Sequence, residues 1–413
     1  MNKQAGFLCA IVVAVIIVGS KAPTTLRAQV SDPSTLPLVS SGGLEYVGAF
    51  RVPAETVNGL SFSYGGQAVA HDPATNSLFI SSLNSVAEVS IPIPVNSSDV
   101  NALPFATFLQ PLNDPTEGHL KDVFDGDVKM EGLMVYGNRL YGTAYIYFDA
   151  PNVQRVSHYS RARQLTQPSF SGWSQVWENG KSGFVAGMLA PVPKEWQAKL
   201  GGPAITGQCC IPIINRTSSG PSAFAFDPSK VGQPTVSATP LLYYPQDHAT
   251  LGSWSGTAPN PSFNQGTEIL GVAVIANTRS ALYFGRTGLG PPCYGEGTSN
   301  KALVGTTSPE GGPYCYDPTN HYKASHAYPY GYQVWAYDLN DFAAVKAGKK
   351  RPWDVVPIVW PLDLPTGEPG TRLGGVGYDA QRQILYVSQM RADSPEAAAR
   401  PLIHAFRVNA RPE

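Results

Sequence analysis

Apolar and polar positions follow one pattern that recurs along the chain: a glycine, a short apolar run, a tight polar turn and a second apolar run. The clearest copies lie near the two ends, in residues 65–81 and 374–388. Short apolar runs bounded by glycine and turn residues are typical of buried β-strands. Each copy therefore predicts one hairpin of an all-β fold.

The pattern can be followed through five copies. A glycine precedes the first apolar run of each copy, at Gly66, Gly132, Gly187, Gly271 and Gly375. In four copies a second apolar run follows a short turn, at 78–80, 140–143, 281–284 and 385–387. The third copy is irregular instead, with a predicted helix at 194–200.

Each copy also predicts strands beyond its hairpin. Third strands are expected at 86–90, 156–160, 222–226, 333–337 and 402–406. Outer strands are expected at 105–109, 173–177, 240–244 and 355–360. The last copy lacks an outer strand, and the alternating strand at 46–52 can supply it. Closing a circle of sheets in this way protects their edges. The sequence therefore predicts a five-bladed β-propeller over residues 44–413, closed by the N-terminal strand.

The hairpin pattern reads Gly, apolar residues, Asp, a turn, then Asn-x-Leu-Phe/Tyr, as in the run from Gly66 to Phe79. It resembles the blades of NHL and SMP-30-like propellers. The resemblance covers the first and fifth copies well, the second and fourth in part, and the third poorly. It implies a fold and leaves the activity open.

Composition fits this fold and limits the classes of binding partner that we expect. The 413 residues include 41 glycines and 37 prolines, with only 14% charged residues, as in turn-rich all-β proteins. The formal net charge of -1 provides no field for holding nucleic acid or an anionic membrane. We therefore expect neither as a partner, and we expect a monomer.

The N-terminus has the features of a secretory signal peptide. Lys3 supplies a positive start, and residues 7–19 form an apolar run of about 13 residues. Small and polar residues follow, so we predict a signal peptide at 1–28 and a flexible lead-in at 29–43. An uncleaved anchor is the alternative, although this run is short for a bilayer.

Four cysteines remain after such cleavage: Cys209, Cys210, Cys293 and Cys315. An even count in an exported chain predicts two disulfides and a secreted or periplasmic bacterial protein. Four cysteines allow three pairings, and the sequence does not choose between them. We prefer Cys209–Cys210 with Cys293–Cys315, because the second bond closes a compact loop within one insertion.

The predicted loops fall into two groups that open on opposite faces of the propeller. Turns within the hairpins are short, as at 72–77 and 379–383. Loops on the other face are long, as at 111–131, 245–270 and 286–332. Long loops in compact domains are usually functional or disordered. Their placement on one face predicts a ligand surface there.

Two carboxylates are expected at the long-loop end of the first strands. Glu131 directly precedes Gly132, and Glu268 lies two residues before the corresponding position in the fourth copy. Two carboxylates facing one channel can act as general acid and as nucleophile or base in glycoside hydrolysis. The alternative is that they bind backbone donors or pair with Arg286 or Arg372.

The insertion at 286–332 is rich in tyrosine, whose flat rings suit sugars. Its His and Tyr residues, foremost His326, are candidate base and acid of a polysaccharide lyase, with Arg286 or Arg391 neutralising a uronate carboxylate. The alternative is a loop whose tyrosines form its own small core. The candidate substrate-binding residues are Tyr294, Tyr316, Tyr328, Tyr330, Arg391 and Trp254.

Two weaker signals concern other ligands. Adjacent cysteines such as Cys209-Cys210 can form a stiff ring, which resembles that of PQQ-dependent alcohol dehydrogenases; the tryptophan docking repeats of those enzymes are absent, so no cofactor is implied. Asp125 and Asp127 are candidate Ca²⁺ ligands without EF-hand spacing, and a solvated acidic loop is the alternative. We expect no other cofactor.

The sequence contains no P-loop, no GxSxG elbow, no HExxH pair and no dinucleotide fingerprint. It therefore favours a secreted carbohydrate-active protein, a glycoside hydrolase or polysaccharide lyase, acting on an extracellular glycan. The alternative is a non-catalytic propeller that binds glycans or surfaces, as a lectin or adaptor does.

Overall fold

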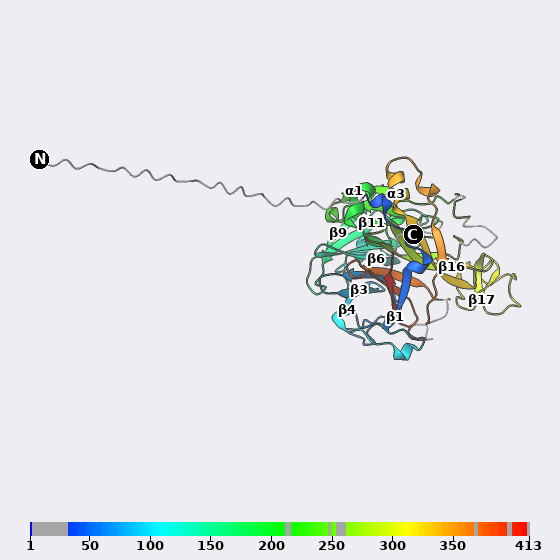
Figure 1. Ribbon diagram of the computed structural model, residues 1–413. Helices are drawn as coiled ribbons and strands as arrows, with labels where there is room; N and C mark the ends of the chain where they lie inside the picture. The colour runs from blue at the N-terminus through cyan, green and yellow to red at the C-terminus, as the bar shows by residue number, and fades with distance from the viewer. Residues whose placement is uncertain are drawn as a thin grey trace. The chain divides into compact units, whose positions relative to one another are not determined.

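A computed structural model of the chain describes Met1 and residues 32–210, 216–246, 248, 250–252, 262–366, 371–394 and 399–410. The signal peptide predicted at 1–28 and the candidate Trp254 lie outside the described residues. The fold is mostly β, and its strands form several separate sheets (Figure 1). Among the described residues, no helix is long and apolar enough to cross a membrane.

Five sheets have four or five strands each, and all but one of their strand pairs are antiparallel. The first sheet contains β2 (Gly65–Asp72), β3 (Ser77–Ser82), β4 (Ser85–Ser90) and β5 (Phe108–Asn113). The second contains β6 (Val128–Tyr136), β7 (Arg139–Ile146), β8 (His158–Ala162), β9 (Ser171–Val176) and β13 (Thr235–Val236), which runs parallel to β9. The third contains β10 (Leu189–Pro191), β11 (Ala204–Thr206), β12 (Ala223–Phe226) and β14 (Ala238–Leu242).

The fourth sheet contains β15 (Glu268–Val274), β16 (Ser280–Gly288), β20 (Tyr330–Asp338) and β21 (Ile358–Pro361). The fifth contains β22 (Leu373–Asp379), β23 (Ile384–Gln389), β24 (Leu402–Val408) and β1 (Leu44–Arg51). Two helices, α1 (Lys194–Leu200) and α3 (Leu339–Lys346), are described, and α1 has the bounds that the sequence predicts. None of these sheets closes on itself within the described residues.

The N-terminal strand completes the fifth sheet, as the sequence predicts. Strand β1 pairs antiparallel with β24, with Phe50 opposite Ile403, so the first and last strands lie side by side. Phe50 is fully buried in the same cluster as Ile403 and Tyr386. Apolar burial along this seam therefore ties the first strand to the last.

The first outer strand begins later than the sequence suggests. We expected it at 105–109, and the structure has β5 at Phe108–Asn113. The reason is competition for backbone partners, because Arg51 of β1 accepts a hydrogen bond from Ala106 and donates one to Pro104. These residues pair with the neighbouring sheet before the chain joins β4.

The first strands of the five sheets are neighbours in space. Strand β2 contacts β6 and β22, β10 contacts β6 and β15, and β15 contacts β22. The repeated glycines explain how the strands come this close. A Cβ atom on Gly132 would overlap the carbonyl oxygen of Gly187, and one on Gly374 would overlap that of Gly66. Each such glycine lets one backbone lie directly against the next.

Two segments have more structure than we expected. In the predicted lead-in, the Val39 N–H donates to Ser280 Oγ over 2.8 Å and the Val39 side chain is buried. The insertion at 286–332 forms a small sheet of β17 (Cys293–Thr298), β18 (Tyr314–Tyr316) and β19 (Lys323–His326). Its backbone groups are thereby paired within the insertion, which accounts for a long loop between β16 and β20.

Candidate functional site

Glu131 lies in β6, directly before Gly132, and it is 4% exposed. Burial raises the pKa of this carboxyl to about 8, although hydrogen bonds with Tyr145 and Gln208 lower it and the charge of Glu268 raises it further. A carboxyl with this pKa is mostly protonated at neutral pH. Glu131 therefore has the protonation state of a general acid.

Two hydrogen-bond arrangements are compatible with the contact between Glu131 and Gln208. Glu131 Oε1 and Gln208 Oε1 are both buried without a hydrogen-bond donor among the described residues, and both lie beside Gly187. A proton on Glu131 satisfies both oxygens by donating to the Gln208 carbonyl. Rotation of the Gln208 amide, which brings its N–H groups to the carboxyl, does the same. Only Gly187 leaves room for these two side chains, because a Cβ there would overlap both.

Glu268 is the first residue of β15, and it is held by two arginines. Arg286 lies opposite it on β16, with Nη2 3.2 Å from Oε1, and Arg372 Nε lies 2.7 Å from Oε2. Burial raises the pKa of Glu268, but the two guanidinium charges outweigh burial and hold the pKa below its ordinary value. Glu268 is thus ionised whereas Glu131 is neutral, and the charge of Glu268 helps to raise the pKa of Glu131.

Two tyrosines, Tyr145 and Tyr147, belong to the same cluster. Tyr145 of β7 hydrogen-bonds Glu131, and burial raises the pKa of its hydroxyl well above the ordinary value. Tyr147 follows two residues later, is 40% exposed, and interacts electrostatically with both Tyr145 and Arg372. The cluster therefore combines a neutral acid, an ionised carboxylate, two arginines and two tyrosines, of which Tyr145 has a raised pKa.

The insertion reaches this cluster through Tyr330. Arg286 lies over the Tyr330 ring, 4.1 Å from its centroid, and Tyr330 donates to Asp317 Oδ2 over 2.7 Å. A row of edge-to-face rings continues outward from Tyr330, through Tyr328 at 6.1 Å to Tyr316 at a further 5.6 Å. Three of the predicted tyrosines are therefore packed into one row that ends at Arg286.

His326 has a different environment from the one expected of a base. It is buried, and its Nδ1 lies 2.9 Å from Asp317 Oδ2. Its Nε2 faces two carbonyl oxygens, those of Gly295 at 3.2 Å and Tyr322 at 3.1 Å. Both ring nitrogens thus face acceptors inside the insertion, and in this arrangement neither is open to a substrate.

The remaining described candidates are exposed residues. Tyr294 is exposed on β17, and Arg391 is exposed after β23. Asp125 and Asp127 are exposed, and Asp127 pairs with Lys129 over 2.7 Å. No group of three or more His, Cys, Asp and Glu side chains that could hold a metal occurs in the described part of the chain.

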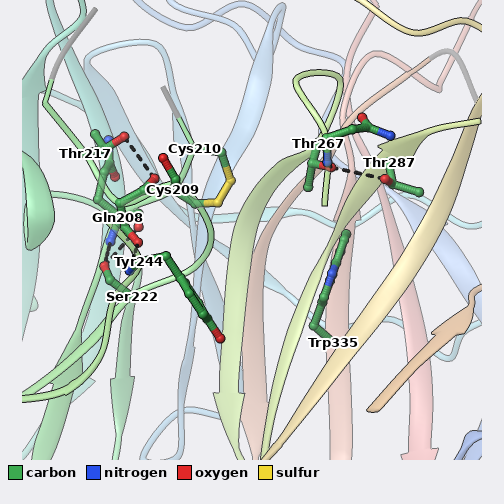
Figure 2. The surroundings of a disulfide bond; sticks show 12 residues. Gln208, Cys209, Cys210, Thr217, Ser222, Tyr244, Thr267, Thr287 and Trp335 are labelled. Carbon is green, nitrogen blue, oxygen red and sulfur yellow. Dashed lines mark hydrogen bonds between the residues drawn. A yellow bond between two sulfur atoms is a disulfide. The ribbon is translucent and has the colours of Figure 1, made fainter. Parts of the chain in front are cut away.

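Both disulfides have the pairing that we preferred: Cys209–Cys210 and Cys293–Cys315. The first is buried above Tyr244 in the same cluster as Trp335 (Figure 2). The adjacent Gln208 is fixed through its backbone, which donates to Ser222 Oγ over 2.8 Å and accepts from it over 2.9 Å. This disulfide thus lies next to the residue that contacts Glu131.

Two cavities are lined by residues of the first strands of the five sheets. One has a volume of about 140 Å³ and is lined mostly by aliphatic residues of β2, β6, β10, β15 and β22, with His71 and Tyr378 at its edge. The other has about 10 Å³ and touches Glu131, Gly132 and Leu270. The second volume has room for roughly one water molecule. Glu131 has the only polar side chain among the described residues lining this cavity, so a water there also needs backbone partners.

No family model matches the sequence, and no curated protein matches it. Solved structures with similar backbones include a glycosyl hydrolase from Bacteroides ovatus, with 10% identity, 93% of each chain covered and a TM-score of 0.40. A luciferin-regenerating enzyme covers 90% of this chain and 94% of its own, with 8% identity and a TM-score of 0.35. Hydrazine synthase of Kuenenia stuttgartiensis has 12% identity, covers 86% and 90%, and has a TM-score of 0.32. No functional argument rests on similarities this low.

Proposed function

We propose that the described sheets form a five-bladed β-propeller closed by β1, and that its Glu131 end cleaves a glycan. The fold proposal is supported by five sheets whose first strands each contact two others. It is also supported by the pairing of β1 with β24. In such a closed ring, Glu131 and Glu268 both lie where the first strands begin.

One observation carries the catalytic proposal: the two carboxyls have pKa values displaced in opposite directions, and the charge of Glu268 contributes to the raised pKa of Glu131. The pKa of Glu131 is raised to about 8 and that of Glu268 is lowered. Pairs of titratable groups separated in this way are typical of acid and base assignments in enzymes. The proposal is also supported by geometry, because Glu131 and Glu268 lie in the first strands of two sheets, β6 and β15.

The proposed reaction is hydrolysis of a glycosidic bond. Glu131 is 4% exposed, so it donates its proton to one water molecule, and that water protonates the leaving glycosidic oxygen as the glycosidic bond breaks. Glu268, kept ionised by Arg286 and Arg372, either attacks the anomeric carbon as nucleophile or takes a proton from the water that attacks it.

A second candidate is non-catalytic glycan binding. It is favoured by the two ion pairs of Glu268, since a carboxylate held by two guanidinium groups is a weaker nucleophile and base than a free one. The same cluster would then hold a sugar without cleaving it.

A polysaccharide panel separates the two candidates. The purified chain is incubated with each polymer while reducing ends and unsaturated uronates are followed. The hydrolase proposal expects reducing ends without unsaturated products, lost in both Glu131→Gln and Glu268→Gln and kept in the exposed control Glu55→Gln. Unsaturated products would indicate a lyase, and binding without either product would indicate the second candidate.

A further inference from the structure

The charges of the Glu131–Glu268 cluster do not balance. Arg286 and Arg372 contribute two positive charges, and Glu268 contributes one negative charge. Glu131 contributes little, because its pKa is about 8. Among these four side chains, positive charge therefore exceeds negative charge at neutral pH. Buried charges are poorly screened by salt.

The two arginines differ in their access to a ligand. Arg286 is 5% exposed and stacks on Tyr330, so it holds Glu268 in place. Arg372 binds Glu268 through Nε, and 50% of its side chain remains exposed. A guanidinium has five N–H donors in a planar fork, so Arg372 retains donors for a second acceptor.

The surroundings of Arg372 suit a sugar ring. Tyr145, Tyr147 and Tyr330 all interact with its charge. Of these three, Tyr147 presents an exposed ring, and the adjacent Phe148 is also exposed. An aromatic face beside a cation fits a ring that carries an acidic substituent.

We propose that the glycan bound at this site is acidic, with a carboxylate or sulfate group that pairs with Arg372 while its sugar ring lies against Tyr147. This inference rests on the proposed glycan function and names its substrate class. Arg372 is then the residue that makes the site prefer acidic polymers over neutral ones. Glu131 and Glu268 keep the roles given above.

The chain contains a matched control for Arg372. Asp393 is likewise held by two arginines, with Arg51 Nε at 2.6 Å and Arg400 Nη2 at 2.6 Å. Arg400 has a partly exposed side chain, like Arg372, but its partner is a nearly buried aspartate outside the cluster. Removing Arg400 thus breaks a similar ion pair without touching the proposed ligand site.

The test measures binding and cleavage of three polymers by the full chain: a polyuronate, a sulfated galactan and a neutral galactan. We expect the wild type to prefer an acidic polymer, with affinity that falls as salt rises. Arg372→Gln should weaken binding of the acidic polymers by about 10- to 100-fold, because one charge-assisted hydrogen-bonding partner is lost. Arg372→Lys should restore part of it, and Arg372→Gln should weaken binding of the acidic polymers far more than binding of the neutral polymer. Preference for the polyuronate or for the sulfated polymer identifies the acidic group.

The outcomes separate this inference from the proposed function. The inference is overturned if Arg372→Gln binds acidic polymers with wild-type affinity. It is also overturned if the control Arg400→Gln weakens acidic binding by the same factor as Arg372→Gln. Both outcomes hold whether or not Glu131→Gln abolishes cleavage. Equal wild-type affinity for neutral and acidic polymers also overturns it. Acidic binding that depends on Arg372, without cleavage of any polymer, supports the inference and contradicts the catalytic proposal. Melting temperatures close to the wild type establish that each variant is folded.

Discussion

Glu268 and Arg372 lie at equivalent positions of two repeat copies, three residues before Gly271 and Gly375, and Arg372 Nε lies 2.7 Å from Glu268 Oε2. Their strands, β15 and β22, are in contact. The ion pair therefore joins two sheets at the end where both strands begin. It also lowers the pKa of Glu268, which separates this carboxyl from the neutral Glu131.

Replacing Glu131 should change how stability depends on pH. The pKa of Glu131 rises from its ordinary 4.5 to about 8 on folding. Between these values the folded chain holds one more proton than the unfolded chain, so the free energy of unfolding falls as pH rises, by about 1.4 kcal/mol per pH unit. Denaturant unfolding from about pH 5 to pH 8 should show a flatter profile for Glu131→Gln. A profile that keeps the wild-type slope, as Glu55→Gln should, would contradict the buried neutral carboxyl.

Replacing Gly132 by alanine should destabilise the protein. A Cβ at this position would overlap the carbonyl oxygen of Gly187 and Thr143 Oγ1, which binds both backbones. We expect a loss of about 1–3 kcal/mol or more in the free energy of unfolding, as for other overpacked sites. Gly42→Ala is the control, because no atom lies within 4 Å of its Cβ position. Equal stability of the two variants would show that β6 and the third sheet are not in close contact.

Removing the Phe50 ring tests the seam between the first and last strands. Phe50 is fully buried, pairs with Ile403 across the strands and contacts the ring of Tyr386. Phe50→Ala should lower the free energy of unfolding by about 3–5 kcal/mol. Ile93→Ala, at a largely exposed residue, should cost little. A small loss at Phe50 would mean that β1 does not stabilise the fifth sheet.

The two disulfides should contribute unequally to stability. Cys293–Cys315 spans 22 residues of the insertion, whereas Cys209–Cys210 encloses no intervening residue. Loop-closure entropy assigns about 3 kcal/mol to the first bond and far less to the second. Replacing Cys293 and Cys315 by serine should therefore expose residues 286–332 to limited proteolysis, whereas the Cys209 and Cys210 double variant should remain resistant there. The opposite order of sensitivity would contradict this account.

Much of the sheet structure follows from local sequence. Short apolar runs and turn residues predict each strand of the five sheets to within a few residues, apart from β11 and β13, and they predict α1. The late start of β5 has a tertiary cause, since Pro104 and Ala106 form backbone hydrogen bonds with Arg51 of another sheet. Competition for backbone partners between distant segments is not visible in a local pattern.

Part of the candidate cluster was visible in the sequence. Glu131 and Glu268 were singled out because they flank repeat glycines, and the alternative that they pair with Arg286 or Arg372 holds for Glu268, which binds both arginines. Tyr145 and Gln208 gave no such signal, because they come from β7 and from the segment after β11. His326 was chosen for its residue type, and burial between Asp317 and two carbonyl groups gives it a structural environment.

The sequence by itself determined the strands, the glycines that let them approach, and the pairing partner of the first strand. These features depend on apolar periodicity and on the missing Cβ of glycine, both of which are local properties. Only the tertiary structure decided that Glu131 is neutral and Glu268 is ionised. Those protonation states depend on burial and on charges supplied by distant segments, which a pattern of residues along the chain does not specify.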